Sequence, residues 1–208
     1  MKFYESGDNR KPVIFLFPGT CCQYSSFDHV LDGLHSYFYT VAVSYDGFDS
    51  NEKTEFYSME DECEKIEQEI RTKYGGRIKA AYGCSLGGSF VSLLIQRKRI
   101  HIDYGIIGSS DMDEAGNLVA KIQASMVVPF MYKMIHTGAL PKFMQKKLNK
   151  TDEVKKELYN GFLNMFGIGK GGNPWITKQS IYNQFYSDLV TKVQHGIDVP
   201  GTTIHVFY

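Results

Sequence analysis

The sequence lacks an excess of charge of either sign. Its 208 residues contain 23 Lys and Arg against 23 Asp and Glu, so the formal net charge is zero. Proteins that bind nucleic acid or anionic membranes through a broad basic surface usually carry a clear positive excess. The composition therefore gives no indication of a nucleic acid partner or of an anionic membrane surface as a partner.

The sequence also lacks long apolar runs and has few cysteines. No stretch of about 18 consecutive apolar residues occurs, and the first residues do not have the apolar core of a signal peptide. We therefore expect a cytoplasmic protein with no membrane span. The cysteines are too few for a disulfide scaffold and, with the scattered histidines, do not have zinc-site spacing. We expect no metal, no cofactor and four reduced, mostly buried thiols, at Cys21, Cys22, Cys63 and Cys84.

Segments typical of strands alternate with segments typical of helices over residues 1–112. The apolar run at 12–17 is typical of a parallel strand that is buried on both faces. Further strands are expected at 40–43, 78–82 and 102–107, with helices between them. This alternation predicts an α/β fold, in which a mostly parallel central sheet is flanked by helices.

The pattern changes after residue 112. Residues 113–194 are helical in character and rich in methionine, which predicts a helical cap or lid inserted into the core. Residues 195–208 return to the sheet with a last strand from 202, which we expect to be buried. A glycine-rich stretch at 167–172 lacks the residues of a phosphate-binding loop and is expected to be an ordinary loop. Lysines between 142 and 156 are expected to lie on a solvated helix face.

The most specific motif is Gly83-Cys84-Ser85-Leu86-Gly87, which matches G-x-S-x-G between an expected strand and an expected helix. Such a turn exposes the serine hydroxyl at the carboxyl end of the strand, above the amino end of the helix. The alternative is a glycine-rich joint in which Ser85 only caps the helix.

A second motif follows the first buried strand, at Pro18-Gly19-Thr20. A hydrolytic serine needs two backbone N–H groups directed at the developing oxyanion. We expect these from Leu86, which follows the serine, and from Thr20, with Cys21 as the neighbouring candidate. The alternative is a common Pro-Gly turn without such a role.

The order of these segments resembles the α/β-hydrolase superfamily, including its helical cap. The resemblance implies Ser85 as the nucleophile, with Leu86 and Thr20 as the oxyanion donors. It also places the triad acid after the strand that ends at Tyr208, and the triad histidine one strand further on. Neither position lies within the sequence. Asp111, after the strand at 102–107, is the one candidate acid in the chain, and its alternative is a turn or cap aspartate.

Two explanations for the missing base remain open. The chain is a truncated version of a longer hydrolase, which the apolar ending Val206-Phe207-Tyr208 favours, or it is a non-catalytic relative. The favoured hypothesis is a serine hydrolase that acts on small or medium acyl esters or thioesters through an acyl-enzyme on Ser85. The alternatives are a binding protein that lacks the base and an acyltransferase. The expected partner is a small acyl substrate, and the oligomeric state cannot be predicted.

Overall fold

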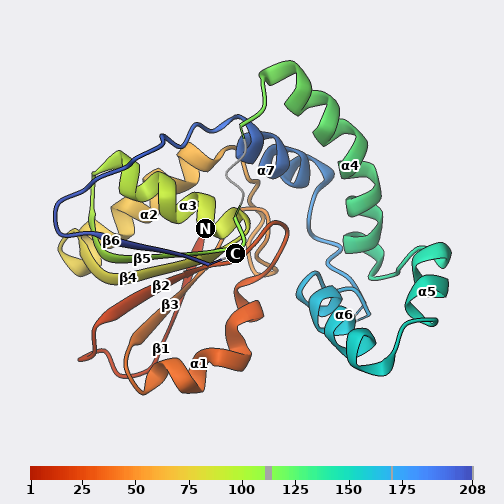
Figure 1. Cartoon of the computed structure of the whole chain (residues 1–208), viewed down its shortest axis with the longest axis horizontal. Coiled ribbons are helices and arrows are strands. Elements are labelled where there is room, and N and C mark those ends of the chain that lie inside the picture. Colours follow the sequence, from red (N-terminus) through yellow and green to blue (C-terminus); the bar gives the residue numbers. More distant parts are fainter. Residues whose placement is uncertain (111–113, 170, 208) are drawn as a thin grey trace.

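A computed structural model describes residues 1–110, 114–169 and 171–207, and its six strands form one sheet (Figure 1). The strand order is β1-β3-β2-β4-β5-β6. β1 is antiparallel to β3, and all other neighbouring strands are parallel, so the predicted, mostly parallel sheet is confirmed. The strands are β1 Lys2–Ser6, β2 Val13–Phe17, β3 Tyr39–Ser44, β4 Arg77–Cys84, β5 His101–Gly108 and β6 Thr203–Phe207.

Helices cover both faces of the sheet, with α2 and α3 on one face and α1 on the other (Figure 1). In β2, Phe15 and Phe17 pack into the cluster under α2 and α3, while Ile14 and Leu16 pack with Phe27 on the α1 side. Successive side chains of a strand point to opposite faces, so the apolar run predicted to be buried on both faces is confirmed. The helices are η1 Tyr24–Phe27 (3-10), α1 Asp28–His35, α2 Met59–Tyr74, α3 Leu86–Arg97, α4 Asn117–Thr137, α5 Lys142–Leu148, α6 Glu153–Met165 and α7 Lys178–Val190.

Four helices, α4 to α7, lie between β5 and β6, and the described residues of this stretch include no strand. In Figure 1, α4, α5 and α6 extend away from the sheet, whereas α7 lies beside it. α7 is hydrogen-bonded to the loop that follows β3: Asn183 Nδ2 donates to the Phe56 carbonyl at 2.8 Å, and the Phe56 N–H donates to Ser180 Oγ at 3.2 Å. α4 in turn packs against α7. α7 therefore connects the outlying helices to the core.

The prediction that the last strand is buried is wrong. All five residues of β6 are exposed, and Phe207 is 60% exposed. β6 pairs with β5 on one side, and no other strand among the described residues pairs with its other side. β-branched and aromatic residues favour a strand whether or not it is covered, so their pattern does not report burial.

The turn between β4 and α3 depends on close backbone packing at two glycines. A Cβ atom on Gly87 would lie 2.1 Å from the Phe17 carbonyl oxygen, and one on Gly83 would lie 2.0 Å from the Gly87 carbonyl oxygen. Only glycine lets these segments approach so closely. The first turn of α3 is thereby fixed against the carboxyl ends of β2 and β4.

We predict that Gly87→Ala lowers the free energy of unfolding by about 3 kcal/mol or more, because the added methyl group overlaps a backbone carbonyl that cannot move alone. The matched control is Gly33→Ala in α1, where an added Cβ meets no atom within 4 Å. It should stabilise the protein by about 0.5–1 kcal/mol, since alanine is the better helix former. Urea unfolding followed by circular dichroism measures both values. Similar effects at the two positions would contradict the packing argument.

Candidate active site

Ser85 stands alone between the last residue of β4 and the first residue of α3, in a strained backbone conformation. Its φ is +54° and its ψ is −127°. Residues other than glycine rarely adopt this backbone conformation. The turn is held by the Ser85 N–H, which donates to the Gly108 carbonyl at 2.9 Å, and by the Gly88 N–H, which donates to the Ser85 carbonyl at 2.8 Å. The Ser85 residue is exposed, and its hydroxyl makes no hydrogen bond with a described residue. The geometry presents this hydroxyl at the carboxyl edge of the sheet.

The amino end of α3 adds a favourable electrostatic environment at this edge. Leu86 begins α3, and the first N–H groups of a helix have no partner within it. The helix dipole also favours negative charge at this end. The Leu86 side chain is fully buried, which fixes the position of its backbone. The Leu86 N–H is therefore placed next to Ser85 as a donor to an anionic oxygen.

The loop after β2 passes directly beside Ser85. A Cβ atom on Gly19 would lie 3.7 Å from the Ser85 Cβ and 3.3 Å from the Cys84 carbonyl oxygen. Thr20, the next residue, is half-buried, and its N–H donates to no described group. The structure thus brings together Ser85, Leu86 and the loop containing Thr20.

Gln184 of α7 holds the next residue of this loop, a contact that the sequence did not indicate. The Cys21 N–H donates to Gln184 Oε1 at 2.7 Å, and both residues are fully buried. Cys21 has a φ of +59°, so this hydrogen bond stabilises a strained turn. Since the Cys21 N–H is already bonded, Thr20 is the free donor of the two candidates. The two partners are 163 positions apart, and no local motif marks a buried glutamine.

The two thiols of the loop after β2, Cys21 and Cys22, are not activated. All four cysteines are free, three are buried and Cys84 is half-buried, which confirms the expectation for the thiols. Burial raises the pKa of Cys21 well above its ordinary value and raises the pKa of Cys22 to about 12. A thiolate is the reactive form of cysteine, so these two buried groups are poor nucleophiles at neutral pH.

None of the six histidines forms a described hydrogen bond with Ser85. His35 is bonded to side chains of β1 and β3, and His101 begins β5; both lie at the amino edge of the parallel strands. His205 lies within β6, where its ring stacks on Tyr104. The other three are His29 on α1, His136 on α4 and His195 between α7 and β6. Asp111, the candidate acid, lies outside the described residues, as do the expected cap start at residue 113 and the final Tyr208.

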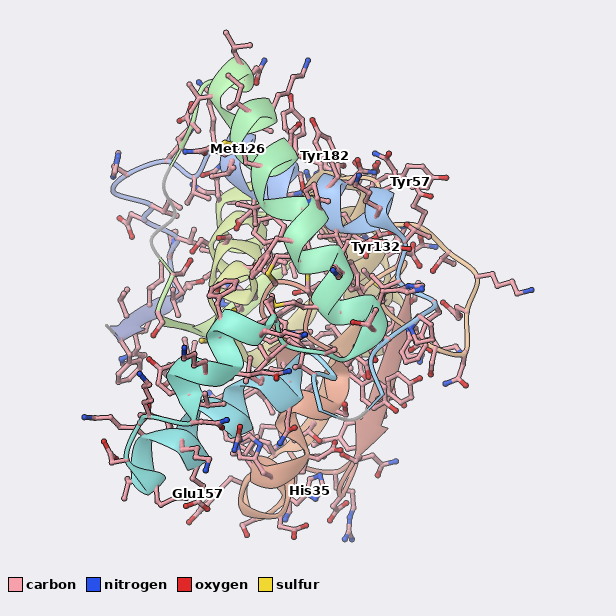
Figure 2. All side chains as sticks on the ribbon, turned by 90° about the vertical axis from the view of Figure 1, so that its right-hand side faces the viewer. His35, Tyr57, Met126, Tyr132, Glu157 and Tyr182 are labelled. Atoms are coloured by element: carbon pink, nitrogen blue, oxygen red, sulfur yellow. The ribbon has the colours of Figure 1, made fainter. Side chains whose placement is uncertain are left out.

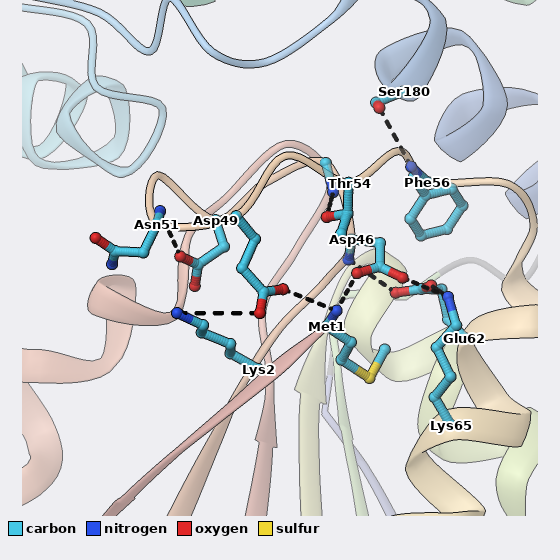
Figure 3. Close-up of polar contacts among 12 residues, drawn as sticks. Met1, Lys2, Asp46, Asp49, Asn51, Thr54, Phe56, Glu62, Lys65 and Ser180 are labelled. Carbon is cyan, nitrogen blue, oxygen red and sulfur yellow. Dashed lines mark hydrogen bonds and ion pairs between the residues drawn. The ribbon is translucent and has the colours of Figure 1, made fainter.

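A buried charge cluster lies after β3, at the same carboxyl edge (Figure 3). The Asp46 N–H donates to Glu62 Oε2 at 3.0 Å, and Lys65 donates to Glu62 Oε1 at 2.7 Å and to the Asp46 carboxylate. Burial raises the pKa of Glu62 to about 7. Burial also acts to raise the pKa of Asp46, but the hydrogen bonds from Lys65 and the Met1 amine outweigh it and hold this pKa below its usual range. The cluster joins α2 to β3, and its residues were not indicated by any sequence motif.

A cleft of about 1400 Å³ separates the start of α1 from α6. Gln23 Nε2 donates to Asn173 Oδ1 at 2.9 Å across it, so the loop after β2 is tied to the cap. The lining is mainly apolar on the α6 side, where Leu158 and Met165 contribute, and Ser85 is not a lining residue. In the glycine-rich stretch, the described residues 167–169 and 171–172 form neither helix nor strand, as expected, and Gly167 and Gly172 line the cleft.

The described residues contain no group of three or more His, Cys, Asp or Glu side chains arranged to bind a metal ion. At the carboxyl edge beside Ser85, the described residues offer an exposed serine and the backbone N–H groups of Leu86 and Thr20.

Sequence comparisons found neither a protein-family model nor a curated protein that matches the chain. Solved structures do match. A carboxylesterase from Nitrososphaera gargenis and a thermophilic esterase from Thermogutta terrifontis each have a TM-score of 0.69 and 14% identity, and each match covers 99% of this chain and 74% of the other. A structure from Desulfitobacterium hafniense, described as α/β-hydrolase family, has a TM-score of 0.67 and 15% identity, with 91% and 72% covered. The chain is shorter than these proteins, and it has the α/β-hydrolase fold.

Proposed function

We propose that this protein is a serine hydrolase of small or medium acyl esters or thioesters. The observation that carries the proposal is the strained, exposed Ser85 at the carboxyl edge of the sheet, with two free backbone donors beside it. The likeness to esterase structures supports the same class of reaction. The cap and the adjoining apolar cleft would accommodate the acyl group or the leaving group.

In the proposed reaction, the Ser85 oxygen attacks the acyl carbonyl carbon, and the carbonyl oxygen becomes an oxyanion. The N–H groups of Leu86 and Thr20 donate to this oxyanion, and such donors are each worth about 10²–10³ in rate. The bond to the alcohol or thiol then breaks, and the leaving group departs with a proton. Water adds to the acyl-enzyme, releases the carboxylic acid and restores the Ser85 hydroxyl.

The proton of the Ser85 hydroxyl needs an acceptor for this sequence of steps. No described residue is hydrogen-bonded to that hydroxyl. This observation favours, as the second candidate, a binding protein that retains the fold and cleft without turnover. A serine without a base is a poor nucleophile, so reactivity at Ser85 separates the two candidates.

We predict that a fluorophosphonate probe labels Ser85 and that p-nitrophenyl acetate or butyrate is hydrolysed. Ser85→Ala should abolish labelling and reduce turnover by at least about 10³-fold, because it removes the nucleophile. Ser109→Ala is the matched control, since Ser109 is another exposed serine with positive φ that follows a parallel strand. It should keep both properties. A folded wild-type protein that is neither labelled nor active would support the binding protein instead.

We predict that Gln184→Leu lowers the free energy of unfolding by about 1–3 kcal/mol, because the buried Cys21 N–H loses its partner. If the loop presents the Thr20 donor, the variant should also lose at least about tenfold in kcat with a smaller change in KM. Gln179→Leu, at an exposed position of the same helix, is the control and should change neither quantity greatly. Thermal unfolding and ester hydrolysis give the two readouts. Unchanged stability in Gln184→Leu would contradict the role of the hydrogen bond, whatever the activity.

A further inference from the structure

α4 has an outward apolar row that no described element covers. Leu118, Ile122, Met126 and Phe130 are four residues apart, so they share one side of the helix. They are 72%, 52%, 69% and 40% exposed, respectively. Figure 2 views this side of the molecule, with α4 in front and Met126 labelled on it. Soluble proteins seldom leave such a continuous row in water without a use for it.

The opposite side of α4 is already occupied. Ala120, Ala124 and Val128 are fully buried, and α4 packs against α7. The helix is long and apolar enough to cross a membrane by length and composition, but this is weak evidence, since core helices pass the same test. A span would have to break the packing on α7. The outward row is therefore suited to contact a surface rather than to cross a bilayer.

The row continues from α4 onto α5. The ring centroids of Phe130 and Phe143 are 6.4 Å apart, and Phe143 is 67% exposed. We call these five side chains the outer apolar row: Leu118, Ile122, Met126, Phe130 and Phe143. It contains two phenylalanines, which partition favourably into the interfacial region of a bilayer.

Positive charge is concentrated in the part of the chain that carries the outer apolar row. Residues 117–165 contain eight lysines, no arginine and three acidic residues, a net charge of +5, so the rest of the neutral chain carries −5. Lys155 and Lys156 pair with Asp152 and Glu153. The other lysines with described side chains form no ion pair with a described residue: Lys121, Lys133, Lys142, Lys146 and Lys150. Unpaired lysines therefore lie on, or directly after, the two helices that carry the outer apolar row, and the compensating negative charge lies elsewhere in the chain.

We propose that the outer apolar row and these free lysines dock the protein on an anionic lipid surface, with α4 lying in the plane of the interface. Helices that bind this way place large apolar side chains in the acyl boundary and lysines among the headgroups. Anionic headgroups complement the net charge of +5 in residues 117–165, whereas a second copy docked through the same segment would bring another positive segment against it. The charge therefore selects the lipid surface over self-association through this face.

The test is co-sedimentation of the protein with vesicles of phosphatidylcholine alone and of phosphatidylcholine mixed with phosphatidylglycerol. Wild type should bind the mixed vesicles at low salt, bind them less at high salt, and bind the neutral vesicles at least about tenfold more weakly. Ile122→Glu combined with Met126→Glu should weaken binding to the mixed vesicles by at least about tenfold. Both positions are exposed, so thermal unfolding should remain that of wild type.

The matched control is Ser50→Glu combined with Gln68→Glu, which makes the same change in net charge at exposed positions outside residues 117–165. It should bind as wild type does. Ser85→Ala should also bind as wild type, so docking is measured independently of hydrolysis. The proposal is overturned if wild type does not bind the mixed vesicles at low salt, or if the Ile122 and Met126 variant binds them equally well. Sedimentation velocity gives a third result that would overturn the proposal. If wild type is a dimer and the Ile122 and Met126 variant is a monomer, the outer apolar row binds a second copy of the chain.

Discussion

The candidate site depends on one steric constraint, the contact of the Gly87 backbone with the Phe17 carbonyl. β2 and α3 meet there with no room for a side chain, and Gly83 makes an equally close contact with Gly87 from β4. The first turn of α3 is therefore fixed at the carboxyl ends of two strands. Because the chain must leave β4 and enter α3 within one residue, Ser85 takes a positive φ. The packing of Gly87 on Phe17 also brings the loop after β2 next to Ser85. The strained serine and the backbone donors beside it therefore result from backbone packing.

The sequence predicted the parts of this arrangement that depend on local patterns. Local residue types also account for the ends of α2, where Ser58 accepts a hydrogen bond from the Asp61 N–H and Gly75 has a φ of +63°. The alternation of strands and helices and the G-x-S-x-G turn were also visible. Contacts between distant segments were not: the hydrogen bond of Gln184 with Cys21 and the burial of Glu62 arise only once the sheet has assembled. The exposure of β6 was missed for the same reason, since it depends on neighbours rather than on its own residues.

The net charge of the whole chain did not indicate a charged surface, because positive and negative residues are distributed unevenly along the sequence. A net charge of zero conceals +5 in residues 117–165 and −5 in the remainder. The two parts are joined through α7, which packs against α4 and holds the Cys21 loop through Gln184. Contacts therefore run without a break from the outer apolar row, through α4 and α7, to the loop beside Ser85. The contact of α7 with that loop is a buried hydrogen bond, which is sensitive to distance and angle. Gln184 therefore holds the strained Cys21 turn, which directly follows Thr20, in place.

The geometry of Ser85 argues against a capping serine. Among the described residues, Ser58, Asp152 and Thr177 cap the starts of α2, α6 and α7. Each has an extended backbone and accepts a hydrogen bond from the first turn of its helix. Ser85 has a positive φ and no cap hydrogen bond. Such a conformation costs about 1–3 kcal/mol in a residue other than glycine. Glycine would avoid that cost, yet this glycine-rich turn has a serine at its strained position. Among the described residues, the Ser85 hydroxyl makes no hydrogen bond that offsets this strain. The strained conformation therefore supports the proposed role of Ser85 as the nucleophile, since a nucleophilic serine sits on such a strained turn between a strand and a helix.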